Sequence, residues 1–388
     1  MNGIYLDNSA TTPLCEAARA RFLAVSQDCW GNPSSLHGWG NAAARELNTA
    51  REAIARALGA RDGQVVFTGS GSEANNLAIL GRAYAKERYR RGARIVTTRG
   101  EHASVTMPLA KLAGEGYEVV EIDTVGGEID MAQLEAALTK NTVLVTVMAV
   151  NNETGARYDI AAIARATHRL CPDAIVHTDA TQAFMKVPVS PRDGADLITV
   201  SAHKIEGPKG CGALWISPAV IKNKGLTPQI LGGGQENGLR SGTENVAGCA
   251  AFGAACDYAR ANFEEHTKAM RACQEYLIKV LQSDTRFAEV KINLPKNRAP
   301  HIVSLTMPSI KSETMLHFLS AEGIYVSSGS ACSSHGRHGA PPLLAFGLSE
   351  KEADNVIRVS LSHRNTKEEM DAFLSALTKG LSSLVRIK

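Results

Sequence analysis

The sequence predicts an α/β protein with a large domain, built on a mostly parallel sheet between layers of helices, and a smaller α+β domain. Three observations lead to this fold class. Short β-branched runs alternate with helical patterns from residue 50 to about 216, and such alternation is typical of parallel sheets covered by helices. A Gly-rich stretch, Leu231–Thr243, ends the alternation. The later residues mix strand and helix patterns, and 388 residues are enough for two or three domains.

The elements of the large domain are expected in a regular order. Each expected strand is a short apolar run rich in β-branched residues, and each expected helix has apolar residues at helical spacing. The expected helices are 51–58, 72–86, 131–138 and 159–170, and the expected strands are 64–68, 94–98, 118–122, 142–150, 174–177, 196–201 and 212–216. Sheets of this kind bind ligands at the carboxyl ends of their strands, so the residues that follow each strand are the first functional candidates.

The C-terminal part begins with a long helical pattern from about residue 244 to 281. Strand patterns follow at 302–306, 324–327 and 356–361, and a final helical pattern covers 367–385. We expect a large domain of residues 15–255 and a small domain that combines residues 1–14 with 256–388. A loop of about residues 327–340, rich in small residues, belongs to the small domain.

Composition and charge argue against several classes of function. The 42 Lys and Arg residues and 39 Asp and Glu residues are interleaved and leave a net charge of +3, so we do not expect direct nucleic-acid binding. The longest apolar run, 143–150, is interrupted by Thr146 and is far shorter than the ~20 residues that span a bilayer. Strand-like sequence begins at Ile4 without a leader pattern. We therefore expect a cytoplasmic protein with no membrane partner.

The turn after the strand 64–68 has the composition of an anion site. Its residues are Gly69-Ser70-Gly71-Ser72-Glu73, and a helix follows at once. Glycine lets the backbone approach an anion, and the first N–H groups of a helix point toward it. The spacing matches neither the Walker motif nor GxGxxG. We predict a phosphate cup here, with an ordinary Ser N-cap as the alternative.

Two later strand ends carry ionisable residues. Asp179 ends one strand, where a carboxylate can keep a ring nitrogen protonated, although an N-cap of the next helix is an alternative. In the segment 201–204, strand alternation puts Ser201 and His203 on one face and Lys204 just past the strand end. A partly desolvated Lys beside other cations has the lowered pKa that Schiff-base chemistry requires, and an exposed surface Lys is the alternative.

These features are more specific together than apart. Pyridoxal phosphate requires a phosphate anchor, an acid for its ring nitrogen and a Lys for its aldehyde. The sequence supplies all three in order at the ends of strands, with Lys204 following Asp179 by 25 residues. We therefore predict pyridoxal 5′-phosphate as the cofactor.

Further motifs resemble those of the cysteine desulfurases of the NifS/IscS branch, which are class V, fold-type I pyridoxal-phosphate enzymes. The motifs run in the same order from residue 4 to about 365. They are DNSATTP (7–13), NPSSLH (32–37), EH (101–102), NNETG (151–155), DATQ (179–182), SAHK (201–204) with GPKG (207–210), RSGT (240–243) and SSGSAC (327–332).

The resemblance implies roles for individual residues. Lys204 would form the Schiff base with the cofactor, and Asp179 would pair with the ring nitrogen. His102 would stack on the ring and move protons, and Arg358 would hold the substrate carboxylate, which suits a planar cationic fork. Ordinary alternatives are a core-packing His102 and a surface ion pair at Arg358. The other implied contacts are Gly71, Ser72, Ser201 and His203 with the phosphate, Asn152 and Gln182 with the ring hydroxyl, Asn152 also with substrate, and Thr243 with the phosphate from the second subunit of a homodimer.

Cys332 differs from the other seven cysteines, which we expect to be small buried residues or surface thiols rather than disulfides. It lies among Gly and Ser residues, which offer little apolar surface to bury it. A mobile loop would let its thiol travel between substrate and acceptor, and the neighbouring His335, Arg337 and His338 would favour its thiolate. Cys332, His335 and His338 do not supply the four ligands of a structural zinc site, so we expect no metal site.

The resemblance implies conversion of L-cysteine to L-alanine, with the sulfur left as a persulfide on Cys332. The persulfide would then serve a sulfur-acceptor protein, such as an iron–sulfur scaffold or a tRNA-thiolation enzyme. Two rival functions share part of the site: a selenocysteine lyase and a class V aminotransferase, of which the aminotransferase needs no loop cysteine. A non-catalytic sulfur-relay or scaffold protein is the rival from outside enzymology, and it would need neither Lys204 nor Asp179.

Overall fold

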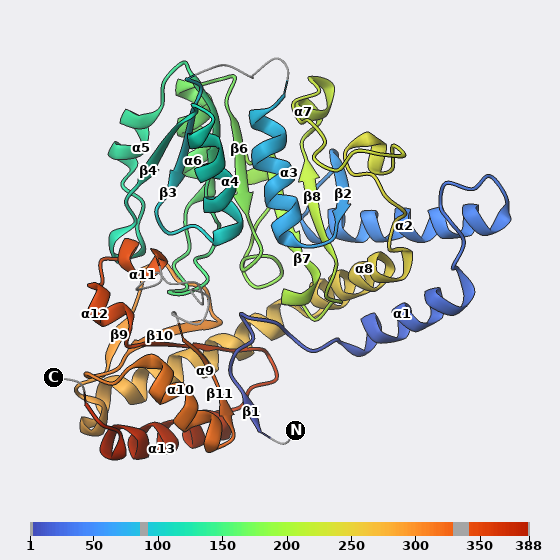
Figure 1. Ribbon diagram of the computed structural model, residues 1–388. Helices are drawn as coiled ribbons and strands as arrows, with labels where there is room; N and C mark the ends of the chain where they lie inside the picture. Colours follow the sequence, from blue (N-terminus) through green and yellow to red (C-terminus); the bar gives the residue numbers. More distant parts are fainter. Residues whose placement is uncertain (1–2, 86–91, 329–340, 387–388) are drawn as a thin grey trace.

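The computed structural model describes residues 3–85, 92–328 and 341–386 (Figure 1). Its largest sheet has seven strands in the order β2-β8-β7-β6-β5-β3-β4. Strand β8 is antiparallel to both of its neighbours, and the other pairs are parallel, so the predicted mostly parallel sheet is confirmed. The strands are β2 Gln64–Thr68, β3 Arg94–Thr98, β4 Glu118–Ile122, β5 Thr142–Thr146, β6 Ile175–Asp179, β7 Leu197–Ser201 and β8 Gly212–Ile216.

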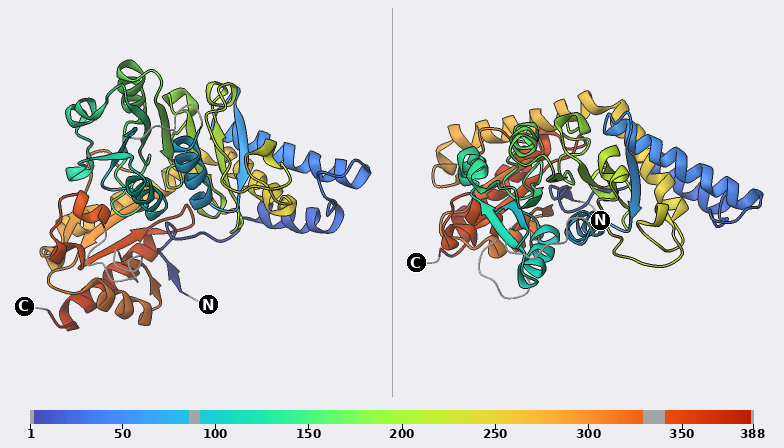
Figure 2. Two further views of the ribbon diagram at one scale, coloured as in Figure 1. Left: turned by 45° about the horizontal axis from the view of Figure 1, so that its top comes forward. Right: turned by 90° about the horizontal axis from the view of Figure 1, so that it is seen from above.

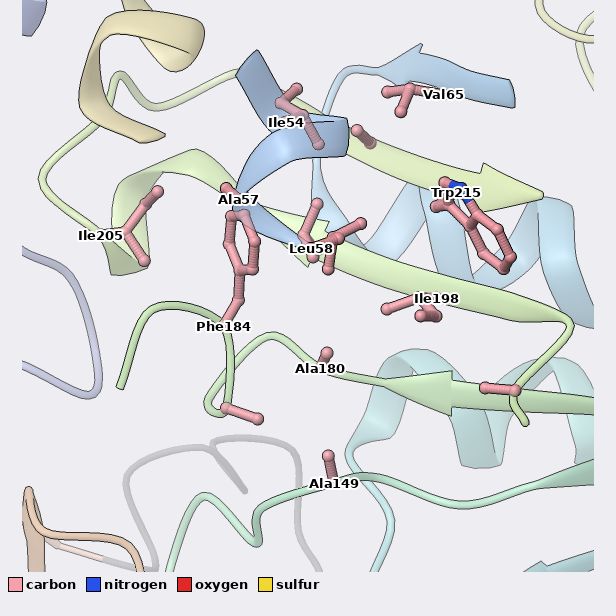
Figure 3. Close-up of a cluster of buried hydrophobic side chains, with 14 of the residues drawn as sticks. Ile54, Ala57, Leu58, Val65, Ala149, Ala180, Phe184, Ile198, Ile205 and Trp215 are labelled. Carbon is pink, nitrogen blue, oxygen red and sulfur yellow. The ribbon is translucent and has the colours of Figure 1, made fainter. Parts of the chain in front are cut away.

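Helices cover both faces of this sheet because successive strand residues point to opposite sides. On one face Val66 and Leu144 pack against α3 and α4, and on the other Val65 and Val145 pack in the core that contains α2, α5, α6 and α8. In this second core Phe184 points toward Ala57 (Figure 3). The helices of this part of the chain are α1 Glu16–Asp28, α2 Gly38–Ala57, α3 Gly71–Ala83, α4 Ala103–Gly114, α5 Met131–Ala137, α6 Ile160–Leu170, α7 Pro218–Lys222 and α8 Val246–Ala261.

The C-terminal residues form a separate four-stranded sheet of order β12-β13-β10-β9, with its own apolar core against α9, α10 and α13. The first residues of the chain join this part, because β1 pairs in parallel with β11. Its elements are β1 Ile4–Tyr5, α9 Phe263–Ser283, β9 Lys291–Asn293, β10 Ile302–Thr306, α10 Ser312–Ala321, β11 Ile324–Tyr325, β12 Ser327–Ser328, α11 Pro341–Ala345, α12 Glu350–Ala353, β13 Val356–Ser360 and α13 Lys367–Ser383.

Several expectations about individual elements were wrong. The strand expected over 324–327 is two short strands, β11 and β12, which belong to different sheets. The helical pattern of 244–281 is two helices, α8 and α9, which separate at Asn262, where the side-chain amide donates to the Tyr258 carbonyl. The strand expected over 142–150 ends at Thr146, although the apolar run continues. The helix expected only over 51–58 begins at Gly38.

Helices α1 and α2 form an arm that extends away from the rest of the chain (Figures 1 and 2). Large apolar side chains are exposed along it. They are Phe22, Leu23, Trp30, Leu36 and Trp39, and the two indole rings lie 4.8 Å apart between centroids. None of the helices in the described ranges is long and apolar enough to cross a membrane.

Candidate active site

A cavity of about 330 Å³ lies where β6 and β7 end and α3 begins, which is the edge of the sheet that the sequence predicted. All predicted site residues except Thr243 and Cys332 line it, although they come from distant parts of the chain. They are Gly71, Ser72, His102, Asn152, Asp179, Gln182, Ser201, His203, Lys204 and Arg358.

The predicted phosphate cup forms the start of α3. The Ser70 hydroxyl caps the helix by accepting the N–H of Glu73, so the N-cap alternative is present, and the phosphate cup stays a prediction. A Cβ on Gly71 would lie 3.2 Å from Thr181 Oγ1 and 3.3 Å from Ser201 Cβ. A side chain here would therefore narrow the space between the helix terminus and the end of β7. The free N–H groups of α3 make this space suitable for an anion.

The Gly-rich stretch Leu231–Thr243 supports the turn 69–73 through an ion pair. Arg240 Nε donates to Glu73 Oε1 at 2.8 Å, and the other carboxylate oxygen accepts the Gly69 N–H at 2.9 Å. Gly212 lets β8 approach the cup, because a Cβ there would lie 2.4 Å from the carbonyl carbon of Ser70. The turn is thus held from two sides.

Asp179 is buried at the end of β6 and is oriented by two donors. Asn75 Nδ2 donates to Asp179 Oδ2 at 2.8 Å, and the Thr181 N–H donates to Oδ1 at 2.9 Å. The sequence analysis did not identify Asn75. Its position one helical turn after Gly71, on the same face of α3, was the available signal.

Ser201, His203 and Lys204 all line the cavity, but β7 ends at Ser201 and the 3-10 turn Ala202–Lys204 follows, so the strand alternation expected to reach His203 is wrong. Lys204 is in the short turn after the strand, and its Nζ donates to the carbonyls of Ser9 at 2.5 Å and Ala10 at 2.9 Å. His203 Nδ1 lies 3.2 Å from Thr11 Oγ1. Burial, reinforced by Lys204 and other nearby cations, lowers the pKa of His203 to about 4, so this imidazole is neutral at pH 7.

Four buried side-chain oxygens of the cavity lining have no hydrogen-bond partner among the described residues. They are the hydroxyls of Ser9 and Ser201 and the side-chain carbonyl oxygens of Asn75 and Asn152. Buried polar atoms in native proteins almost always have a partner. A bound molecule with a hydroxyl or phosphate group would satisfy them, so the residues present fit a polar, phosphate-bearing cofactor.

Arg358 is buried in β13 and contacts two carboxylates, so the alternative of a surface ion pair is wrong. Its Nη1 lies 2.9 Å from Glu153 Oε1 and 2.9 Å from the Asn152 carbonyl, and Nη2 lies 3.1 Å from Asp7 Oδ1. Burial raises the pKa of Asp7, while Arg358 and Lys204 oppose the rise. Asp7 and Glu153 could not be recognised from the sequence as partners of Arg358, because only the tertiary fold brings them to it.

His102 faces the open cavity and is not a core-packing residue. Its Nδ1 accepts the Ser104 N–H, which places the proton of the neutral ring on Nε2. Desolvation of the ring between the cavity walls lowers the pKa of His102, although the negative charge of Asp179 opposes this shift. The preceding Glu101 is fully buried, and burial raises its pKa to about 8. Its carboxyl group accepts the Met148 N–H and so holds the cavity wall in place.

A smaller cavity of about 40 Å³ lies behind Lys204 and is also lined by Lys186. The Lys186 amine is buried, has no hydrogen-bond partner among the described residues, and was not identified from the sequence. Burial, together with the charges of Lys204 and Arg358, lowers its pKa to about 7. The sequence surroundings of Lys186 carry no charge pattern that would have revealed this.

Two predicted residues are not part of the cavity as described. Thr243 is exposed in the loop before α8 and does not line the cavity of its own chain. Cys332 lies outside the described residues, as do His335, Arg337 and His338.

Comparisons with known proteins agree along nearly the whole chain. Residues 4–373 match the aminotransferase class-V family. A cysteine desulfurase IscS of Dictyoglomus turgidum is 35% identical over 384 residues, which cover 98% of this chain and 95% of the relative. A cysteine desulfurase IscS of Clostridium botulinum is 37% identical over 384 residues, covering 97% and 94%. A solved NifS-like protein superposes with a TM-score of 0.90 at 32% identity, covering 99% of this chain and all of the other.

Proposed function

The chain belongs to the aminotransferase class-V family, and we propose that it is a cysteine desulfurase that converts L-cysteine to L-alanine. The observation that carries this proposal is one cavity that gathers ten of the predicted residues and has four buried oxygens without partners among the described residues. Cysteine desulfurases are its relatives over almost the full length of both proteins.

We propose pyridoxal 5′-phosphate as the cofactor. Gly71, Ser72 and the unpaired Ser201 hydroxyl would hold the phosphate beside the terminus of α3, together with the neutral ring of His203. Lys204 would hold the cofactor covalently. When bound, pyridoxal phosphate withdraws electrons from the bonds at the substrate α-carbon.

The remaining cofactor contacts use side chains with matching hydrogen-bonding groups. Asp179, oriented by Asn75 and the Thr181 N–H, would keep a proton on the ring nitrogen. The unpaired Asn152 oxygen suits a hydroxyl donor. The Gln182 amide donates to the Ser9 carbonyl in this structure, so Gln182 would contact a ring hydroxyl with its other atom or by exchanging this partner.

The chain's own groups would then move protons and sulfur. Lys204 would take the proton from the substrate Cα, and His102 would carry protons at Nε2. The Cys332 thiolate would attack the substrate sulfur, so that an S–S bond forms while the substrate C–S bond breaks. The carbon that loses sulfur takes up a proton and Lys204 returns one to Cα, which yields L-alanine and a Cys332 persulfide. Atoms and electrons balance without an added oxidant or reductant.

Arg358 would orient the substrate through its carboxylate. Because Asp7 and Glu153 already contact the guanidinium, the substrate carboxylate would share the group with them or replace one of these contacts. Asn152, whose carbonyl accepts from Arg358, lies beside this position.

We propose a homodimer in which Thr243 of each subunit completes the phosphate site of the other. Its exposure outside its own cavity supports this arrangement. The apolar side chains of the α1–α2 arm, among them Trp30 and Trp39, form the surface that a second copy would cover. Sedimentation of the active enzyme tests the dimer, and an active monomer at assay concentration would contradict it.

A sulfur-acceptor protein is the proposed partner, because a persulfide must be passed on for the enzyme to turn over repeatedly. Iron–sulfur scaffolds and thiolation enzymes are the proposed acceptors. We place the enzyme in the cytoplasm, where reducing conditions keep a working thiol available. The domain division at about residue 255 also stays a proposal, supported by the two separate apolar cores.

The test is product analysis of the purified holoenzyme with L-cysteine as the sole substrate. A cysteine desulfurase releases alanine and, with a thiol reductant, sulfide. A class V aminotransferase consumes an oxo acid and gives no sulfide, and a selenocysteine lyase prefers L-selenocysteine. A scaffold protein shows no cofactor absorbance in the visible range. Absence of alanine in the presence of bound cofactor would contradict the proposal.

A further inference from the structure

A second cavity, of about 530 Å³, lies on the other side of a wall of the candidate site. Ala149 lines this second cavity, whereas its neighbours Met148 and Val150 line the candidate site. The second cavity is formed by the start of α6, by residues 187–193, and by α9 with residues 296–298. It therefore lies where the large sheet meets the C-terminal part of the chain.

The lining of this cavity is rich in cations. Four basic side chains contribute to it: Arg157, Arg271, Lys296 and Arg298. Among the described residues the Arg157 side chain makes one hydrogen bond, to the Pro188 carbonyl at 3.3 Å, and Lys296 Nζ lies 3.7 Å from Glu128 Oε1. These two contacts are long and leave most of the N–H groups of both side chains available.

The guanidinium groups of Arg271 and Arg298 have no partner among the described residues. Arg271 is exposed on α9, where the absence of a partner is ordinary. Arg298 differs, because its Nε is buried although the side chain as a whole is only half-buried. A buried charged N–H without an acceptor is unfavourable, so an acceptor is missing from this position.

The two carboxylates of the lining do not supply this acceptor. Asp159 caps α6 by accepting the Ala162 N–H at 2.9 Å, and Asp193 accepts the Ser190 N–H at 3.0 Å within a capping box. Both acids stabilise local turns. The cavity thus combines several unpaired guanidinium donors with acids that are bonded elsewhere.

We propose that this cavity binds a small molecule that carries two or more linked phosphates. Guanidinium groups pair with phosphate oxygens through two parallel hydrogen bonds, and several of them around one hollow match more than one phosphate. The volume lies within the range of small-molecule sites. The ligand would accept from Arg298 and Arg271 and would also contact Arg157, whose segment pairs with that of Arg298.

Such a ligand would connect two segments, 155–157 and 297–299, that backbone hydrogen bonds already join. The Arg157 N–H donates to the Asn297 carbonyl at 2.9 Å, and the Ala299 N–H donates to the Gly155 carbonyl at 2.9 Å. A polyanion that bridges Arg157 and Arg298 would strengthen this junction. We therefore expect it to raise the melting temperature of the holoenzyme.

The experiment is calorimetric titration of the holoenzyme with inorganic pyrophosphate at physiological salt. The holoenzyme is used because its own cofactor phosphate fills the cup at α3 and prevents binding there. The test variant is Arg271→Gln/Arg298→Gln, and the matched control, Arg61→Gln/Arg260→Gln, removes two exposed arginines outside the cavity. Citrate is titrated in parallel to separate phosphate from carboxylate recognition.

Saturable binding to the wild type and the control, weakened about tenfold or more in the test variant, is the expected result. No saturable binding at millimolar pyrophosphate, or equal binding by both double variants, would overturn the proposal. Binding of citrate but not pyrophosphate would overturn the phosphate assignment. If the double variant fails to fold, the single variant Arg271→Gln, which changes only an exposed side chain, serves with the same criteria.

Discussion

The cofactor half and the carboxylate half of the candidate site are built in different ways. The cofactor half comprises Gly71, Asp179, Ser201, His203 and Lys204. Each of these residues lies at or just after the end of a strand, or at the start of a helix. The backbone of one sheet therefore fixes their relative positions.

The carboxylate half comprises Asp7, Glu153 and Arg358, which come from three segments far apart in the chain. These residues are held by mutual ion pairs. The Ser201 hydroxyl in the cofactor half has no partner among the described residues, whereas the Arg358 guanidinium contacts two carboxylates. If Arg358 binds the substrate carboxylate as proposed, the carboxylate half must exchange contacts, while the Ser201 hydroxyl is already available to a ligand.

The largest effect is expected from replacing Lys204, the proposed covalent anchor of the cofactor. Lys204→Ala should leave the fold intact and reduce alanine formation by at least about 10³-fold, because the anchor and the base for the substrate Cα are lost together. Alanine formation and thermal melting are measured side by side. The control is Lys209→Ala, which removes an exposed Lys five positions later. Wild-type turnover by the Lys204 variant would refute the assignment.

The next effect separates cofactor binding from sulfur chemistry. Cys332→Ser should retain the cofactor absorbance and still bind L-cysteine, because no proposed cofactor contact uses this thiol. It should lose persulfide formation, because a serine hydroxyl is a poor nucleophile toward sulfur. Persulfide is measured by alkylation and mass analysis, with Cys29→Ser as the control at a half-buried cysteine. Persulfide retained on the Cys332 variant would assign the acceptor role to another residue.

A smaller effect tests whether the carboxylate half exchanges contacts. Arg358→Gln should raise the KM for L-cysteine by about 10- to 100-fold, because a charge-assisted pair with the substrate carboxylate is lost. Asp7→Asn should instead lower KM a few-fold, because it removes a carboxylate that competes for the same guanidinium. If Asp7→Asn raises KM as Arg358→Gln does, Asp7 holds Arg358 in place and does not compete with substrate.

The two halves also differ in how far the sequence could predict them. The strands β2, β3, β4, β8 and β10 have the predicted boundaries because turn residues flank short, buried apolar runs. The cofactor half follows from these strand ends. The strand predicted over 142–150 was too long because residues 147–150 continue the apolar run: they are buried in the core beside the sheet, but they lie beyond the end of β5 at Thr146.

Other features depend on tertiary contacts that no local pattern encodes. Glu153 was part of a recognised motif, but its contact with Arg358 spans 205 positions. Glu101 likewise stood beside His102 in a motif, and only its burial and its bonds to the Met148 N–H show that it supports the cavity wall. Periodicity reports which face of an element is apolar, but it does not report which buried charges meet.

The smallest effect on turnover is expected at Lys186, which shares the region around Lys204 with Arg358 but lacks the partners that Arg358 has. Burial lowers the Lys186 pKa to about 7 in the folded protein, compared with 10.5 for an ordinary lysine. Between these values the unfolded chain binds more protons, so this group makes wild-type stability rise with pH from about 7 to 10.5. Below pH 7 the full penalty for the buried amine applies, and at 1.36 kcal/mol per unit it is at most about 5 kcal/mol. Lys186→Met should therefore stabilise the holoenzyme most at or below pH 7, and the gain in stability should vanish near pH 10.5.

Thermal melts across this pH range measure the gain in stability, with Lys279→Met on the exposed face of α9 as the control. Parallel pH profiles for wild type and Lys186→Met would mean that the amine is solvated or paired in solution, and the contrast with Arg358 would then fail.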